Sequence, residues 1–137
     1  MIIADTSGLL ALYNQREPSH HQVRSAVEAA PGPLVVSPFV VAELDYLVAT
    51  RMGPDAELSV LAELAGGAYE LAAISRSELD DCRGVVERYR DQEIGVADAS
   101  LVVLAARYAT RSILTLDRRH FDVLRPIGGG RFKLLPA

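Results

Sequence analysis

Short apolar runs alternate along the chain with longer segments whose apolar residues recur every three or four positions. The apolar runs predict strands at residues 1–5, 34–37, 69–74, 112–116 and 132–136. The longer segments predict helices at residues 6–15, 19–30, 38–52, 55–65, 76–92 and 96–109, with a short helical turn at 117–124. Strands that alternate with helices in this way favour an α/β fold, with a parallel sheet covered on both faces.

The 137 residues have the length of one domain, which we expect to span residues 1–137. No apolar run approaches the roughly 18 residues of a spanning helix, and the N-terminus lacks an export signal, so we expect no membrane association. The lone Cys82 has no partner for an internal disulfide and no neighbouring metal-ligand pattern. These features predict a cytoplasmic protein in which Cys82 is structural.

One acidic residue lies where an apolar residue is expected. In the helix predicted at 38–52, Glu43 shares an apolar stripe with Val40 and Leu44, whereas Asp45 points to the other side. A carboxylate on such a stripe loses hydration, so it needs a partner or becomes protonated. We therefore expect Glu43 to be either a ligand of a cation or part of a buried salt bridge.

Three further carboxylates lie at the ends of predicted elements. Asp5 and Asp117 each follow a strand, and Asp98 lies in the first turn of the apolar helix at 96–109. Each has a structural explanation: Asp5 and Asp117 suit helix caps, and Asp98 suits the positive end of a helix dipole. Nevertheless, side chains that follow parallel strands gather at one edge of the sheet, where such folds bind ligands.

Together with Glu43, these residues predict a metal site. Four carboxylates at one edge would raise one another's pKa values unless a cation lay between them. Oxygen ligands select a hard cation, Mg²⁺ or Mn²⁺, which activates water and stabilises charge on a phosphodiester.

The charge distribution bears on nucleic-acid binding. The net charge of −4 argues against a general nucleic-acid binder. However, residues 117–137 carry five basic and two acidic side chains. Arg118 and Arg119 directly follow Asp117, so they are candidates for RNA phosphate contacts, although a solvated turn would explain them equally well.

Four stretches together resemble a known family. MIIADTSGLLALY, SPFVVAELDYLV, IGVADASLVVLA and ILTLDRRHF resemble the PIN-domain ribonucleases, and specifically the VapC toxins of VapBC toxin–antitoxin systems. The likeness covers nearly the whole chain in the family's order. AELDYLVATR and LTLDRRHFDVLRPIGGGRF look especially like mycobacterial and related actinobacterial toxins.

The resemblance implies a three-layer α/β/α PIN-like fold with a parallel sheet of about five strands, usually as a homodimer. It also implies an endoribonuclease dependent on Mg²⁺ or Mn²⁺ that cleaves a structured RNA, transfer or ribosomal, through attack of a metal-activated water on a phosphodiester. The family's acidic quartet, which is catalytic and binds the metal, falls on Asp5, Glu43, Asp98 and Asp117. The hydroxyl residues beside the quartet, which either support the ligands or act as caps, are Thr6, Ser7 and Thr115.

As a toxin, the protein is expected to bind a cognate VapB-like antitoxin, and a basic side chain would complement the four carboxylates. The main alternative is a catalytically inactive PIN fold that acts only by binding or regulation, against which the intact acidic positions argue. A haloacid-dehalogenase-like phosphohydrolase is disfavoured, because Ser7 stands where that family has a second Asp and Lys133 is the only lysine.

Overall fold

The computed structural model describes residues 1–137, and its centre is a five-stranded sheet in which all pairs are parallel. The strand order is β3-β2-β1-β4-β5. The strands are β1 (Ile2–Ala4), β2 (Leu34–Val36), β3 (Glu70–Leu71), β4 (Ser112–Leu114) and β5 (Lys133–Leu135). The predicted fold class, α/β with a parallel sheet of about five strands, is therefore confirmed.

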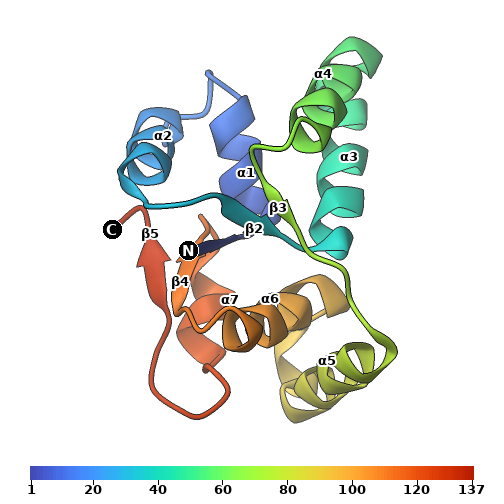
Figure 1. Ribbon diagram of the computed structural model, residues 1–137, viewed down its shortest axis with the longest axis vertical. Coiled ribbons are helices and arrows are strands. Elements are labelled where there is room, and N and C mark those ends of the chain that lie inside the picture. Colours follow the sequence, from blue (N-terminus) through green and yellow to red (C-terminus); the bar gives the residue numbers. More distant parts are fainter.

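Helices cover both faces of this sheet (Figure 1). One face carries α1 (Thr6–Tyr13), α2 (His20–Ala29), α3 (Pro38–Met52) and α4 (Pro54–Ala65). The other carries α5 (Arg76–Arg88), α6 (Val96–Arg107) and α7 (Arg118–Val123). The predicted three-layer arrangement is thus present, and none of the helices combines the length and hydropathy needed to cross a bilayer.

The chain direction explains why the helices divide between the two faces. From β1 the chain moves outward through β2 to β3, and it then returns to the other side of β1 and moves outward through β4 to β5. Because crossovers between parallel strands are right-handed, the reversal of direction puts the later helices on the opposite face. The reversal lies between β1 and β4, and ligands in open α/β sheets bind at such a point.

The centre of the sheet is the most buried part of the molecule. Ile3 and Ala4 of β1 are fully buried, and they pair with Ile113 and Leu114 of β4. Gly8, in the first helix, lies so close to β4 that an added Cβ would be 2.5 Å from the Leu114 carbonyl oxygen. Only glycine permits this approach, which brings the start of α1 against the end of β4.

Most elements are slightly shorter in the structure than predicted, and two are markedly shorter. The strand predicted at 69–74 contains only Glu70 and Leu71, whose side chains are both exposed because β3 is an edge strand. The helix predicted at 76–92 ends at Arg88, and a single 3₁₀ turn follows at Arg90–Gln92. Glu93 then adopts a left-handed conformation with φ of 56°, which redirects the chain toward α6.

Candidate functional site

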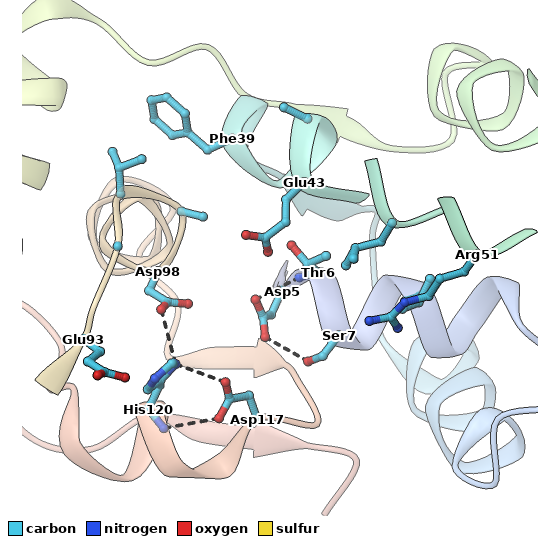
Figure 2. A pocket seen from close by; sticks show the side chains of 16 residues that line it. Asp5, Thr6, Ser7, Phe39, Glu43, Arg51, Glu93, Asp98, Asp117 and His120 are labelled. Carbon is cyan, nitrogen blue, oxygen red and sulfur yellow. Dashed lines mark hydrogen bonds and ion pairs between the residues drawn. The ribbon is translucent and has the colours of Figure 1, made fainter. Parts of the chain in front are cut away.

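A cleft of about 650 Å³ opens beyond the carboxyl ends of β1 and β4, and the four predicted carboxylates all line it (Figure 2). Asp5 comes from the end of β1, Glu43 from α3, Asp98 from the first turn of α6 and Asp117 from the start of α7. The structure therefore brings four residues that are far apart in the sequence to the point where the strand order reverses.

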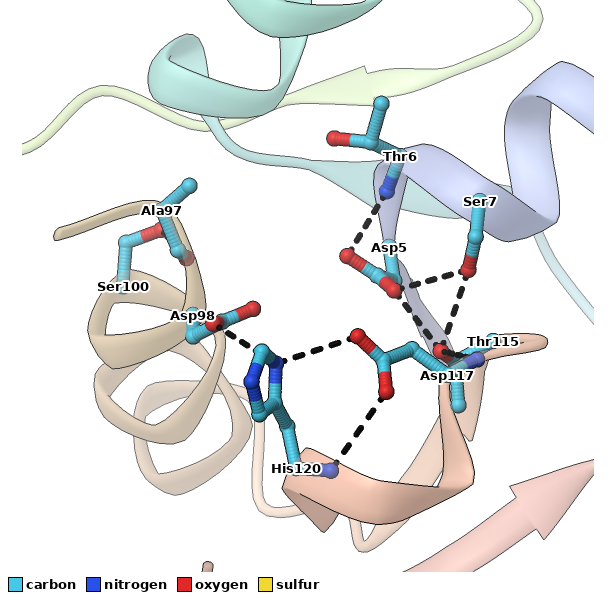
Figure 3. Close-up of polar contacts among 9 residues, drawn as sticks. All are labelled: Asp5, Thr6, Ser7, Ala97, Asp98, Ser100, Thr115, Asp117 and His120. Carbon is cyan, nitrogen blue, oxygen red and sulfur yellow. Dashed lines mark hydrogen bonds and ion pairs between the residues drawn. The ribbon is translucent and has the colours of Figure 1, made fainter. Parts of the chain in front are cut away.

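Asp5 is the most tightly held of these side chains (Figure 3). It is 6% exposed, and its Oδ1 accepts a hydrogen bond of 2.8 Å from the backbone N–H of Thr6, the first residue of α1. Its Oδ2 accepts hydrogen bonds from the hydroxyls of Ser7 at 2.9 Å and Thr115 at 2.7 Å. Asp5 is thus a helix cap, as the structural explanation held, and it is also fixed at the base of the cleft.

The same hydroxyls connect β4 to the turn that carries Asp117. The Ser7 hydroxyl accepts a hydrogen bond from the backbone N–H of Leu116 at 2.9 Å, and the Thr115 hydroxyl accepts one from the N–H of Asp117 at 2.9 Å. Ser7 and Thr115 therefore orient the Asp5 carboxylate directly and also hold the backbone from which the Asp117 side chain extends.

Asp117 also caps α7, where its Oδ1 accepts a hydrogen bond of 3.4 Å from the backbone N–H of His120. The His120 Nδ1 lies 3.0 Å from Asp117 Oδ2 and 3.3 Å from Asp98 Oδ2. These are ion-pair distances without the alignment of a hydrogen bond. The imidazole thus lies between two of the carboxylates (Figure 3).

The two helices that carry Glu43 and Asp98 are joined at their N-termini. Ser37 caps α3, and its hydroxyl contacts the hydroxyl of Ser100 on α6 at 2.7 Å; both side chains are fully buried. Ser100 also donates to the Ala97 carbonyl oxygen at 2.6 Å. This buried contact fixes the distance between α3 and α6 at the rim of the cleft.

The expectation that Glu43 is buried on the apolar stripe of α3 was wrong. Val40 and Leu44 are fully buried, but Glu43 is exposed to the cleft. The acidic residue of α3 that loses hydration is Asp45, whose Oδ1 is buried without a hydrogen-bond partner. The reason is that α3 packs with Val40, Leu44 and Val48 against the core, so that Glu43 falls at the edge of the buried stripe.

Electrostatics in the cleft favour the neutral forms of two acids. Burial, together with the charges of Asp5, Asp117 and Glu43, raises the pKa of Asp98 to about 6, although His120 opposes the rise. Burial also raises the pKa of Asp5, although the hydrogen bonds from its neighbours act in the opposite direction. Crowded carboxylates whose pKa values rise are the groups that a cation stabilises in their charged form.

The chemistry of these residues fits a hard divalent cation. The donors are carboxylate oxygens, and the Thr6 hydroxyl beside Asp5 is buried with no hydrogen-bond partner, so that it is free to bind a water of hydration. No three of the acidic or histidine side chains come close enough together to share one ion. A cation in this cleft therefore requires side chains such as Asp98 and Asp117 to turn toward it.

The predicted phosphate contacts lie outside this cleft. Arg118 and Arg119 are exposed and line a neighbouring hollow of about 420 Å³ that shares Ser7 and Asp117 with it. Arg118 donates a hydrogen bond of 2.9 Å to the Pro136 carbonyl oxygen. The two arginines are thus beside the carboxylates, on the outer side of Asp117.

Other residues of the cleft were not predicted from the sequence. Phe39 and Arg51 lie on α3 at four residues before and eight residues after Glu43, a spacing that places them on its face of the helix. Glu93 adds a fifth carboxylate, and it reaches the cleft because of its left-handed backbone. Their spacing from Glu43 along the helix could have predicted that Phe39 and Arg51 line the cleft, whereas nothing in the sequence indicates Glu93.

Comparison with known proteins finds relatives over nearly the whole chain. The family model for the PIN domain matches residues 2–125. A curated protein of Mycobacterium tuberculosis, Ribonuclease VapC26, is 60% identical over 135 residues, which are 98% of this chain and 100% of that protein.

Solved structures share the fold at low sequence identity. The M. tuberculosis toxin VapC20, described as cleaving the sarcin-ricin loop, matches with a TM-score of 0.79 and 19% identity, over 85% of this chain and 90% of its own. A chain of a toxin–antitoxin complex from Klebsiella pneumoniae gives a TM-score of 0.69 and 17% identity, over 90% and 92% of the two chains. At these identities the likeness concerns the fold alone.

Proposed function

We propose that this chain, which belongs to the PIN-domain family and is a ribonuclease of the VapC type, is the toxin of a toxin–antitoxin pair that cleaves a structured RNA with the help of Mg²⁺ or Mn²⁺. The observation that carries the proposal is the cleft in which Asp5, Glu43, Asp98 and Asp117 face one another. The rise in the pKa of Asp98, which burial and the charges of Asp5, Asp117 and Glu43 cause together, supports a cation shared among them.

In this proposal the four carboxylates hold the cation, and Thr6, Ser7 and Thr115 support them. When bound, such a cation would lower the pKa of a water molecule and neutralise charge on the phosphodiester. Ser7 and Thr115 donate to Oδ2 of Asp5 and the Thr6 N–H donates to Oδ1, so that the carboxylate is held in one orientation. Arg118 and Arg119, beside Asp117, would attract the phosphates that flank the site.

The proposed partner is an antitoxin with a basic side chain that enters the cleft. Five carboxylates and a single arginine line this cleft, so a guanidinium or ammonium group would relieve their repulsion as a cation does. A homodimer is proposed from the family resemblance. The RNA substrate and the unpaired thiol of Cys82 suit a cytoplasmic location.

The test is to incubate the purified, antitoxin-free protein with total RNA from its own host and to map new 5′ ends. The reaction is run with Mg²⁺, with Mn²⁺ and with a chelator, and Asp98→Asn is the matched control. We expect cuts that require metal and disappear in the variant, and these cuts would also identify the RNA. If no metal yields cuts, the chain acts by binding alone and the ribonuclease proposal fails.

A further inference from the structure

One face of α3 borders the cleft along its whole length. Phe39, Glu43, Leu47 and Arg51 follow one another at intervals of four residues, and all four line the cleft. Residues spaced in this way lie on one side of a helix, and the twelve residue-to-residue steps from Phe39 to Arg51 span roughly 18 Å. Figure 2 shows Phe39 and Arg51 on opposite sides of the site, with Glu43 between them. We call these four residues the α3 face.

Arg51, at one end of the α3 face, is a cation without a partner. It is the only lysine or arginine among the residues that line the cleft, and its side chain is exposed. None of the molecule's ion pairs includes it, although Glu43 lies on the same face. A guanidinium that remains free beside carboxylates is available to a phosphate, which it can bind with two parallel hydrogen bonds.

Phe39, at the other end, is the only phenylalanine or tyrosine that lines the cleft, and its side chain is half-buried. It takes no part in the one pair of packed aromatic rings, which Phe121 and Phe132 form in the core. A phenylalanine ring that borders a cleft offers a surface on which an unpaired base can stack. Leu47 adds an apolar position between the carboxylates and Arg51.

We propose that the α3 face is the binding surface for single-stranded RNA, with Arg51 on a phosphate at one side of the cleaved bond and a base stacked on Phe39 at the other. This proposal rests on the ribonuclease function proposed above and adds how the substrate lies. It requires an unpaired segment, because a base within a duplex has no free face for Phe39. Since stacking tolerates any base, the α3 face sets affinity and position rather than sequence preference.

The test measures binding separately from cleavage. A fluorescein-labelled single-stranded RNA is titrated with the full chain in Mg²⁺ at several salt concentrations, and an Asp98→Asn background blocks cleavage. We expect Arg51→Ala to weaken binding about tenfold and to reduce the slope of log K against log salt by about one. Arg51→Lys keeps the charge and should retain the slope. Phe39→Leu should weaken binding roughly tenfold with an unchanged slope, and Phe39→Tyr should bind as the parent does.

Arg76→Ala is the control, because it removes one exposed positive charge at the start of α5, outside the cleft. An equal loss in Arg51→Ala and Arg76→Ala would reduce the effect to net charge and overturn the proposal. Unchanged RNA binding in Arg51→Ala and Phe39→Leu would also overturn it. A third outcome would also overturn the proposal: Arg51→Ala binds RNA normally but loses affinity for polyglutamate. The α3 face would then bind an acidic protein segment instead of RNA.

Cleavage by the metal-loaded wild-type chain keeps the two proposals apart. If Arg51→Ala and Phe39→Leu cut host RNA with the same kcat/KM as the wild type, the ribonuclease proposal is supported and the proposed role of the α3 face is rejected. If the protein binds RNA through Arg51 and Phe39 but does not cut it, the ribonuclease proposal is rejected and the proposed role of the α3 face in RNA binding is supported. Melting temperatures of all variants show that each is folded, and the two arginine variants decide the matter should Phe39→Leu unfold.

Discussion

Two carboxylates on α3 lie only two residues apart but in different surroundings. Glu43 faces the cleft, where it meets carboxylates from β1, α6 and the start of α7. Asp45 instead meets Glu57 of α4, and the close approach of the two carboxyl groups raises the pKa of Glu57. Crowding of like charges is therefore common to both regions.

The two regions differ in whether a ligand has room to bind between the carboxylates. The cleft has room for a ligand, and hydroxyl and backbone N–H groups fix its base around Asp5. The pair of Asp45 and Glu57 lies between two consecutive helices, outside the cleft, and Asp45 is the only charged group that shifts the pKa of Glu57. Acidic residues that lie close together are thus no sign of a site by themselves. Convergence from several elements at the ends of the central strands is what distinguishes the cleft.

The largest effect is expected from loss of a carboxylate in the cleft. Asp98→Asn should lower metal-dependent RNA cleavage on the order of a thousandfold, because several kcal/mol of charge stabilisation at the phosphodiester depend on the cation. Asp45→Asn makes the same chemical change on the other side of α3 and should leave the rate within about twofold of the wild type. Single-turnover cleavage of the mapped RNA measures both variants, and equal losses would refute the distinction between the regions.

A smaller effect is expected from the groups that fix the base of the cleft. Thr115→Val removes the hydroxyl that donates to Asp5 and accepts from the Asp117 N–H, so the Asp5 carboxylate and the backbone of Asp117 each lose a contact that holds them in place. Loss of such a partner should weaken Mn²⁺ binding about 10- to 100-fold, as measured by calorimetry. Thr50→Val is the control, since the Thr50 hydroxyl bonds only to carbonyl oxygens of its own helix. Unchanged Mn²⁺ affinity in Thr115→Val would remove this support from the proposed site.

The next effect concerns the stability of the metal-free protein. The pKa of Asp98 is about 6 in the folded chain against an ordinary value of 3.8, so the folded state disfavours its charged form. Stability is therefore highest at acid pH through this group and falls by about 2 kcal/mol as pH rises from 4 to 7. In a chelator, Asp98→Asn should lack this fall and melt several degrees higher at pH 7.5 than the wild type.

Added Mg²⁺ or Mn²⁺ should reverse that order, because the cation stabilises the charged carboxylate that the chelated protein disfavours. Melting curves from pH 4 to 8, with and without metal, measure both halves of the prediction. If the melting temperatures of Asp98→Asn and the wild type changed with pH in the same way, Asp98 would not be the group whose raised pKa lowers stability at neutral pH.

Sequence patterns were sufficient for the parts of the structure that depend on local periodicity. The sequence predicts all five strands, because each is a short apolar run; every strand is shorter in the structure than predicted, and the exposed edge strand β3 is shortened most. The positions of Asp5 and Asp117 followed from the rule that parallel strands end at one edge. These features depend on the order of the elements rather than on how closely they pack.

The sequence failed where the outcome depends on how one helix lies against the core. The apolar stripe of α3 placed Glu43 inside, whereas the rotation of α3 on the sheet leaves Glu43 in the cleft and partly buries Asp45. The same rotation brings Phe39 and Arg51 to the cleft, and a local pattern has no information about it. Glu93 was missed because its position depends on a left-handed turn that its own residue type does not favour.

The smallest effect is expected at the pair on the other side of α3. Glu57→Gln replaces a repelled carboxylate with an amide whose N–H can donate to Asp45, so the melting temperature should rise slightly at neutral pH. Because the pKa of Glu57 is raised in the folded state, its destabilising effect is present above its ordinary pKa of 4.5 and disappears at lower pH. The variant and the wild type should therefore melt together near pH 3.5.

Glu63→Gln provides the comparison for this last change, because it removes the same charge from an exposed position of α4 without touching Asp45. We expect it to leave the melting temperature unchanged at both pH values, and we expect neither variant to affect RNA cleavage. If Glu57→Gln lowered cleavage, the carboxylates of α3 and α4 would act as one group with the cleft. The division between a functional and a merely tolerated acidic cluster, on which the choice of Glu43 over Asp45 depends, would then have to be abandoned.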